Sequence, residues 1–347
     1  MSDIQFVNPL DFSDWDERVG KFPEATIFHS VAWARLLIES YGFIPFYCIA
    51  RQGKEIAGIL PLMEVRDVLG RKKSVSLPFS DFCEPLFVCP EGFKRCIEFI
   101  KKNENNKQWR YLELRGGKRF FNDNPAFDAV YSHEIDLNIE QEVIFKSFHD
   151  TTRRNIRKAE KYGLRTIHEN SIEAVRSFFH LNCLTRRDHC LPPQPWKFFY
   201  CLWKNMLSRK NGFVTLVDID GRPIAGNLYL VFGKKAFYKY GASDRGFQNM
   251  RPSHLAMWEG IKHCREQGFH GLNLGRTEQH HTGLLKYKRS YNAKETIIQY
   301  YRFNADDGSF YLKNQSASRE NLRKLAFSRL PIPVLRIIGN VLYKFAA

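Results

Sequence analysis

The sequence has no long hydrophobic run and no secretory leader. No stretch reaches the roughly 18 uncharged apolar residues that a membrane span requires. The first residues, MSDIQFVNPLDFSDWDE, carry acidic side chains where a signal peptide carries lysines followed by an apolar run. We therefore expect a cytoplasmic protein that is either soluble or attached peripherally to the inner face of the cell membrane.

The sequence also has no CxxC pair among its eight cysteines, and several of them lie inside apolar patterns. This usage is typical of reduced thiols in a cytoplasmic protein. The possible metal ligands His180, Cys183, His189 and Cys190 lack the paired spacing of zinc sites. We therefore expect no bound metal and no permanently bound cofactor.

Acidic residues are scarce relative to basic ones. The chain has 37 Asp and Glu against 53 Lys and Arg, which gives a formal net charge of +16. Such an excess favours polyanionic partners, for example a phosphorylated carrier, a nucleic acid or an acidic membrane surface. Net charge does not choose among them.

An internal repeat is visible in the letters of the sequence. GKEIAGILPL at 53–62 and GRPIAGNLYL at 221–230 share Gly, Ile, Ala, Gly, Leu and Leu at matching positions. After each copy come strands, an amphipathic helix and a short strand that ends in Arg, YLELR at 111–115 and LNLGR at 272–276. The matched order indicates a duplicated unit, although two similar β-hairpins could share a decapeptide by chance.

A length of 347 residues exceeds a typical single domain. Hairpins mixed with crossover helices predict an α/β (α+β) fold in which each half is a mixed, mostly antiparallel sheet flanked by helices. We predict an N-terminal domain over residues 1–138, a C-terminal domain over 139–310 and a basic amphipathic tail over 311–347. The C-terminal domain is expected to begin with a helix near 139–162.

The segment HDTTRRNIRKAEKYGL at 149–164 predicts a helix with a strongly basic surface. One buried stripe is expected at spacings of three or four residues, from Phe145, Phe148, Thr152, Ile156 and Ala159. The other faces then carry Arg153, Arg154, Arg157, Lys158 and Lys161. Arginine suits bidentate contacts to phosphate, whereas an ordinary solvated helix face is the alternative.

The stretch 252–288 is predicted to form a helix, a short strand, a loop and a second helix. Ser253 can cap the first helix, and Gly268 ends it. The strand at 271–275 presents Arg276 on a loop rich in His and Glu. Loops at the ends of buried strands often carry the chemistry of α/β folds, but a solvated basic turn would have the same composition.

The last segment, NLRKLAFSRLPIPVLRIIGNVLYKF at 321–345, mixes apolar residues with Arg and Lys. It is too short and too charged to span a bilayer, and it suits a lipid interface backed by basic side chains. A C-terminal helix that packs on its own domain is the alternative.

Four groups of residues occur in a characteristic order. They are HSVAWARLL at 29–37, RRNIRKAEKYGL at 153–164, YGASD at 240–244, and finally Gly275-Arg276, Gly283-Leu284 and Tyr287-Lys288. In this order they resemble the FemAB family, tandem GNAT-fold transferases that add amino acids to peptidoglycan precursors, and its FemAB-like relatives of exopolysaccharide and exosortase systems. Tyr287, Tyr291 and Asn292 replace the more usual Phe, Trp and Gly of the family.

The resemblance implies transfer of an acyl or aminoacyl group from an activated donor, acyl-CoA or aminoacyl-tRNA. The acceptor would be an amine on a cell-envelope polysaccharide or peptidoglycan precursor. Residues 243–255, SDRGFQNMRPSHL, do not spell the loop with which acetyl-CoA GNAT enzymes hold pyrophosphate, so coenzyme A is not established as the donor.

Direct attack by an amine needs donor and acceptor held together, a base, and donors for the oxyanion. We assign phosphate or oxyanion contact to Arg276, Lys286 and Lys288, and the base to Asp244 or Glu278. The strand end adds Tyr240 and Ser243 to the substrate-binding set.

The basic helix adds a second set of binding residues, Arg153, Arg154, Arg157 and Lys158. We expect these side chains to grip a lipid-linked or nucleotide-linked phosphorylated precursor, or tRNA. The rival interpretation is a non-catalytic protein, either a basic nucleic-acid-binding protein or a membrane-peripheral scaffold of a polysaccharide system. No obvious base-stacking platform is interleaved with the basic residues, which disfavours the first of these rivals.

Overall fold

The computed structural model describes residues 3–103, 108–121, 124–304, 307–313, 327 and 330–346. Residues 314–326, 328, 329 and 347 of the predicted tail therefore lie outside the described part of the chain. The chain divides into two compact units. Unit 1 takes in Met1–Val130, Ile297–Gln315 and Leu342–Ala347, and unit 2 takes in Tyr131–Thr296 and Ser316–Val341.

These units differ from the predicted segments 1–138, 139–310 and 311–347. The main reason is strand β15 (Lys294–Phe303), which begins in unit 2 and continues in unit 1.

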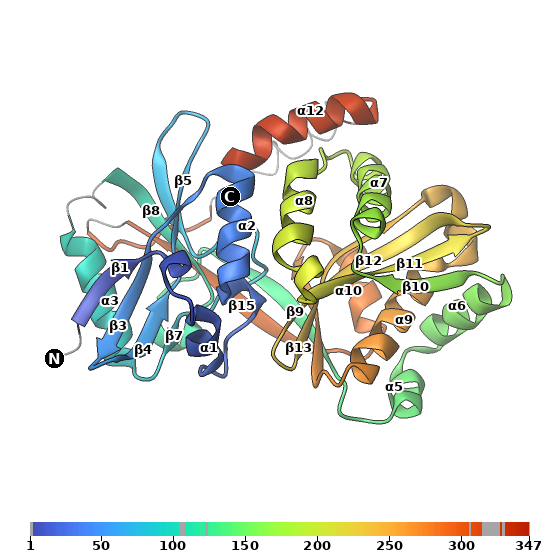
Figure 1. Ribbon diagram of the computed structural model, residues 1–347, viewed down its shortest axis with the longest axis horizontal. Coiled ribbons are helices and arrows are strands. Elements are labelled where there is room, and N and C mark those ends of the chain that lie inside the picture. Colours follow the sequence, from blue (N-terminus) through green and yellow to red (C-terminus); the bar gives the residue numbers. More distant parts are fainter. Residues whose placement is uncertain are drawn as a thin grey trace. The chain divides into compact units, whose positions relative to one another are not determined.

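Unit 1 combines a four-stranded antiparallel sheet with a second group of strands (Figure 1). The four-stranded sheet has the order β1 (Asp3–Val7), β3 (Tyr47–Gln52), β4 (Glu55–Leu60), β7 (Leu86–Phe87). The second group has the order β15, β8 (Trp109–Arg115), β6 (Lys72–Val75), β5 (Met63–Arg66), β2 (Ile44–Pro45). The helices are α1 (Trp15–Gly20), α2 (Val31–Tyr41), α3 (Pro90–Lys102) and α4 (Lys118–Phe121). Strands β6 and β8 are parallel.

Unit 2 has one large mixed sheet. Its strand order is β10 (Arg165–Glu169), β11 (Gly212–Ile219), β12 (Arg222–Phe232), β13 (Lys235–Ser243), β14 (Gly271–Glu278), β9 (Asp128–Asp136). The helices are α5 (Gln141–Ser147), α6 (Asp150–Lys161), α7 (Ile172–Asp188), α8 (Trp196–Asn205), α9 (Pro252–Glu266), α10 (Thr282–Arg289) and α12 (Ile332–Leu342). Strands β10 to β13 are antiparallel, and β13 and β14 are parallel.

Helices α7 and α9 lie on opposite faces of the unit 2 sheet (Figure 1). Side chains alternate along β12, so Gly226 faces Phe178 of α7 whereas Tyr229 packs on Gly260 of α9. At both glycines a Cβ would lie within 3 Å of a neighbouring side chain, so the absence of a side chain lets the helices approach the strand.

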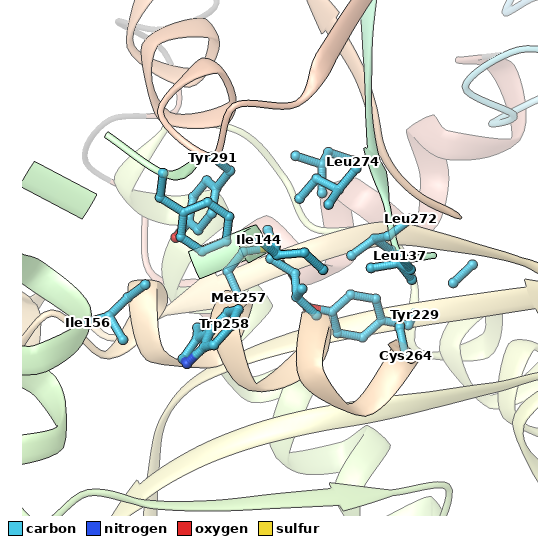
Figure 2. Packing of buried hydrophobic residues seen from close by; sticks show 14 of the residues in the cluster. Leu137, Ile144, Ile156, Tyr229, Met257, Trp258, Cys264, Leu272, Leu274 and Tyr291 are labelled. Carbon is cyan, nitrogen blue, oxygen red and sulfur yellow. Dashed lines mark hydrogen bonds between the residues drawn. The ribbon is translucent and has the colours of Figure 1, made fainter. Parts of the chain in front are cut away.

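The core beneath α9 is rich in aromatic residues. Figure 2 shows Met257, Trp258 and Cys264 of α9 packed beside Tyr229 and Tyr291. Leu272 and Leu274 of β14 close the cluster from the sheet. This packing fixes α9 and β14 relative to each other, and both elements reach the site described below.

The helix predicted near 139–162 is two helices, so that prediction was wrong in extent. Phe148 and His149 have extended backbone (ψ 150° and 145°), which separates α5 from α6. His149 accepts a hydrogen bond from the backbone amide of Thr151 and caps α6, and its own amide donates to the carbonyl of Ser290 (2.9 Å). The break therefore ties the start of α6 to the end of α10.

The decapeptide repeat corresponds to two hairpins, β3–β4 and β11–β12. Its first glycine, Gly53 or Gly221, lies in the turn with a positive φ (61° and 77°) that favours glycine. Its second glycine leaves no space for a side chain, because a Cβ would lie 2.1 Å from the Phe87 ring at Gly58 and 2.8 Å from Leu216 at Gly226. In each unit the structure thus explains why both shared positions are glycine.

Candidate functional site

Strands β13 and β14 run parallel but pair only near their beginnings. Lys235 pairs with Gly271, and the pairing ends at Phe237 with Asn273. β13 continues to Ser243 and β14 to Glu278 without further pairing between them. Beyond Phe237 backbone groups of the two strands bond to side chains instead, because the amide of Ser243 donates to Thr185 (2.9 Å) and the carbonyl of Gly275 accepts from Lys288 (2.8 Å).

A pocket of about 280 Å³ lies beside this unpaired end of β13. Strand β13 contributes Tyr238 and residues 241–243, and the start of α9 contributes residues 251–254. Tyr287 of α10 and Asn227 of β12 complete most of the wall. We call this space the wedge pocket.

The first turn of α9 faces the wedge pocket. Pro252 occupies the start of the helix, and Arg251 is the N-cap residue with φ 61° and no capping side chain. The N-terminus of a helix carries partial positive charge. Within the described residues the Nε of Arg251 is buried and has no hydrogen-bond partner. The helix end and the guanidinium together favour a negatively charged or strongly polar group in the pocket.

His254 lines the pocket and is held on both sides. Its Nε2 accepts from Asn155 Nδ2 (3.2 Å), so Nδ1 carries the proton and donates to the hydroxyl of Tyr291 (3.1 Å). Burial, with a smaller contribution from the charge of Arg251, lowers the pKa of His254 to about 4. His254 is therefore neutral at pH 7 and links α6, α9 and α10 through hydrogen bonds.

Two tyrosine hydroxyls lie close to this network. Tyr287 accepts from Tyr291 (3.3 Å) and donates to the carbonyl of Ser253 (3.2 Å), and burial raises the pKa of Tyr287 to about 12. Burial also raises the pKa of Tyr238. A Cβ at Gly241 would lie 1.9 Å from the hydroxyl of Tyr238, so glycine makes room for that side chain. Both hydroxyls stay protonated at neutral pH.

Lys288 is buried, with 2% of its surface exposed. Its Nζ donates to the carbonyls of Gly275 (2.8 Å) and Arg276 (3.1 Å). Gly275 has a positive φ of 71°, which turns the chain at this point. The ammonium group thereby joins α10 to the end of β14. Its predicted contact with phosphate or an oxyanion stays a prediction.

Arg276 and Glu278 lie together at the end of β14. Arg276 Nη2 is 4.0 Å from Glu278 Oε1, and the two side chains are 37% and 38% exposed. Lys286 is exposed on α10. None of the three lines the wedge pocket, so the structure does not join them to that space.

The predicted residues at the end of β13 also differ in whether they line the wedge pocket. Ser243 lines the wedge pocket, whereas Tyr240 donates to Gln194 (2.7 Å) outside its lining. Asp244 accepts from a backbone amide of the following turn (2.9 Å) and from Arg222 Nη2 (2.8 Å). A base at Asp244 would have to take a proton through a carboxylate that already holds these two partners, and that role stays a prediction.

The predicted basic helix corresponds to α6. Its predicted stripe is buried at Phe148, Thr152, Ile156 and Ala159. A second pocket, of about 470 Å³, lies where α5, α6 and α9 meet, and Phe145, Trp258, Arg153 and Arg157 line it. We call it the α6 pocket.

The four predicted arginine and lysine side chains of α6 have different surroundings. Arg153 donates to the carbonyl of Lys146 (2.6 Å), and the guanidinium of Arg157 lies 5.6 Å from the centre of the Phe145 ring. Arg154 and Lys158 are exposed and do not line the α6 pocket.

Sequence reasoning missed the residues that shape the wedge pocket: Arg251, His254, Tyr238, Gly241 and Tyr287. A weak signal was present in Pro252, since proline is common at the first position of a helix and marks its N-terminus. The tyrosines come from separate elements, and no local pattern indicates that they meet.

Comparison with known proteins gives a consistent result. Residues 146–289 match the family described as Acetyltransferase (GNAT) domain. Lipid II:glycine glycyltransferases are 32% identical in Staphylococcus epidermidis and 30% in Staphylococcus saprophyticus, each over 76 residues. These matches cover 20% of this chain and 18% of each relative, so the chain matches less than a fifth of the length of these relatives.

Solved structures match over a much larger share of the chain. FemX aligns with a TM-score of 0.67 at 12% identity, over 86% of this chain and 96% of FemX. A C-terminal domain of a putative lysylphosphatidylglycerol synthetase from Agrobacterium fabrum gives 0.53 at 15% identity, over 82% and 90%. A tandem GNAT protein of the clavulanic acid pathway gives 0.50 at 9% identity, over 89% and 100%. At these identities the likeness concerns the fold, and it confirms the predicted tandem GNAT-like architecture.

Proposed function

We propose that this chain, which contains a GNAT domain at residues 146–289 within a FemAB-like fold, is an acyltransferase. It would move an acyl or aminoacyl group from acyl-CoA or aminoacyl-tRNA to an amine on a peptidoglycan or envelope polysaccharide precursor. The observation that carries the proposal is the separation of β13 from β14 beside the wedge pocket. A donor could lie there, beside strand ends that do not pair with each other.

The chemistry requires no nucleophile from the protein. The amine nitrogen of the acceptor attacks the carbonyl carbon of the donor, and the bond to the donor sulfur or ribose oxygen breaks. The leaving group takes up a proton, and the new amide nitrogen loses one. Positioning and oxyanion stabilisation supply most of the rate.

The wedge pocket offers one neutral donor for that oxyanion, the hydroxyl of Tyr238, which lies next to Gly241. Asp244 and Glu278 remain the carboxylates proposed as base. Lys288 would act by holding β14 in place, because its ammonium donates to two carbonyls of that strand.

The α6 pocket would hold the phosphorylated part of a substrate, a lipid-linked or nucleotide-linked precursor or tRNA. Phe145 and the mostly buried Trp258 line it, and Arg153 and Arg157 add positive charge beside the carboxylates of Glu142 and Glu160. Phosphate can pair with a guanidinium. The curated relatives are named for glycine transfer on lipid II, which is itself lipid-linked.

The outer face of α12 supports peripheral attachment to an anionic membrane. Leu335 and Gly339 are buried, whereas Ile337 and Val341 are 64% and 53% exposed on the other face. Residues 332–346 contain no acidic side chain. Among the described residues no helix combines the length and the apolar character needed to cross a bilayer. An amphipathic helix of this kind lies along the lipid surface.

Flotation with vesicles of phosphatidylglycerol tests this attachment. The triple substitution of Val334, Ile337 and Val341 by Ser should remove the protein from the lipid fraction, and Asn340→Ser should not. Equal flotation of both variants would argue against α12 as the attachment.

The activity itself is tested in two steps. Thermal shift against acyl-CoAs, aminoacyl-tRNA and undecaprenyl-linked precursors identifies the donor class, because a ligand that binds only the folded state stabilises it by mass action. Turnover with that donor is then compared in Gly241→Ala and Gly283→Ala. A Cβ at 241 must displace the hydroxyl of Tyr238, whereas at 283 it meets nothing within 4 Å.

We expect Gly241→Ala to lose about 100-fold in kcat/KM, the scale of a misplacement by roughly 1 Å, and Gly283→Ala to keep its rate. Full activity in Gly241→Ala would remove the wedge pocket from the mechanism. Binding of polyanions without turnover of any donor would instead support a non-catalytic scaffold.

A further inference from the structure

The loop between β14 and α10 gathers three side chains that can ligate a metal. Glu278, His280 and His281 each place one ligand atom within 4.8 Å of the others. His280 Nε2 lies 3.5 Å from Glu278 Oε2, and the two imidazole centres are 4.2 Å apart. Within the described part of the chain this is the one group of three such residues. We propose that it is a binding site for a divalent transition-metal ion, with zinc as the first candidate.

A tight turn fixes the backbone of the three residues. The amide of His281 donates to the carbonyl of Glu278 (3.0 Å), and the amide of Thr282 donates to the carbonyl of His280 (3.0 Å). β14 ends at Glu278 and α10 begins at Thr282, so a buried strand and a helix hold both ends of the turn. Only side-chain rotation is then needed to complete the site.

The distances fit this requirement. A tetrahedral zinc ion with bonds near 2.0–2.1 Å places its ligand atoms about 3.4 Å apart. The Glu278–His280 pair is already at that separation, and the ligand atom of His281 lies within 4.8 Å of both. His280 and His281 are exposed and can move without disturbing the core.

The chemistry of the ligands selects the metal. Two imidazoles and one carboxylate suit zinc, cobalt or nickel, whereas calcium and magnesium prefer oxygen ligands. Three protein ligands leave a fourth position for water or an exogenous group. Arg276 lies 4.0 Å from the other oxygen of Glu278 and orients that carboxylate from outside. Its positive charge also opposes the ion and weakens the binding.

This inference goes beyond acyl transfer, and it shares Glu278 with the carboxylates proposed as base. The sequence analysis predicted no metal, because His180, Cys183, His189 and Cys190 lack the paired spacing of zinc sites. It assigned Glu278 as a candidate base. Metal binding would make Glu278 a ligand instead, since one carboxylate does not serve both purposes at once.

The test uses the full-length protein, freed of metal by chelator and of any histidine tag. Cys89→Ser serves as the background, because Cys89 is an exposed thiol that can bind zinc by itself. Equilibrium dialysis with Zn²⁺ at pH 7.5 should show one bound equivalent. Visible absorption with Co²⁺ should show the intense bands of tetrahedral coordination.

Single substitutions then locate the ion. We expect His280→Ala, His281→Ala and Glu278→Gln each to weaken zinc binding at least tenfold, and His270→Ala, an exposed histidine at the other end of β14, to leave it unchanged. Absence of a bound equivalent, or one that persists in the His280→Ala/His281→Ala double variant, would overturn the proposal.

Discussion

Strands β8 and β14 hold equivalent places in units 1 and 2, yet their ends differ. Each follows an amphipathic helix, α3 or α9, and each pairs in parallel with a neighbour, β6 or β13. In unit 1 the pairing continues to the end of β8, because Ser76 donates to the carbonyl of Glu113 (2.8 Å) and accepts from the amide of Arg115 (2.7 Å). In unit 2 the pairing stops at Phe237, and the wedge pocket begins there.

Arg115 at the end of β8 and Arg276 at the end of β14 also differ in their surroundings. Arg115 is buried, donates to Glu113 (3.2 Å) and to the carbonyl of Ser80 (3.2 Å), and shares Glu113 with Arg302. Arg276 is more than a third exposed and lies 4.0 Å from its carboxylate. One copy of the repeat has thus buried the arginine at its strand end in a network of ion pairs, and the other leaves that arginine partly exposed.

The largest expected effect comes from exchanging these arginines for glutamine. Arg115→Gln leaves the Glu113 carboxylate without one of its two buried cations, which should cost about 3–5 kcal/mol in the free energy of unfolding. Arg276→Gln removes a partly exposed ion pair worth about 0–1 kcal/mol. Urea denaturation of both variants measures the difference. Equal losses would mean that the two arginines contribute equally to the free energy of unfolding.

The elements themselves were predictable from local patterns. The buried stripe of α6 follows from the spacing of apolar residues, and the strand at 271–275 was found as the first part of β14. The break between α5 and α6 was missed, because the hydrogen bond from His149 to Ser290 that accompanies it joins residues far apart in sequence. Local periodicity carries no information about such a contact.

The candidate site was less predictable. Arg276, Glu278 and Lys288 were singled out from a charged loop, and the structure brings them near one another at the end of β14. The wedge pocket depends on where two strands stop pairing, and the buried tyrosines that wall it come from β13 and α10. Such a pocket arises from tertiary packing, so the sequence of no single segment predicts it.

Lys288 provides the next test, because it holds the open strand end in place. Lys288→Met removes the donor to the carbonyls of Gly275 and Arg276, and an unsatisfied buried acceptor costs about 1–3 kcal/mol. We expect a loss of about 2–4 kcal/mol in the free energy of unfolding, measured by urea denaturation. A turnover loss of that same size, but with stability intact, would show instead that Lys288 stabilises the transition state.

Lys288→Arg separates these outcomes further. The guanidinium keeps the charge but cannot occupy the compact site between the two carbonyls in the same way. Restored turnover without restored stability would point to the charge itself, and loss of both would point to the geometry of β14.

The smallest expected effect is the dependence of stability on pH. It distinguishes the units because His168 and His254, the two histidines concerned, both lie in unit 2. Burial, with smaller contributions from neighbouring positive groups, lowers the pKa of His254 and of His168 to about 4, whereas histidine in an unfolded chain titrates near pH 6.5. Between these values the unfolded state binds more protons than the folded state. Stability therefore falls as the pH drops from about 6.5 to about 4.

At pH 5 the contribution of His254 should be smaller than at pH 7 by about 1–2 kcal/mol, since one pKa unit corresponds to about 1.4 kcal/mol. Hydrogen exchange measures the loss in each unit separately, and we expect it in the amides of β12, β13 and α9. His254→Gln should reduce this pH dependence, and substitution of the exposed His270 by Gln should not. A dependence that is equally steep in unit 1, or that survives His254→Gln together with His168→Gln, would assign the acid sensitivity to groups other than these two histidines.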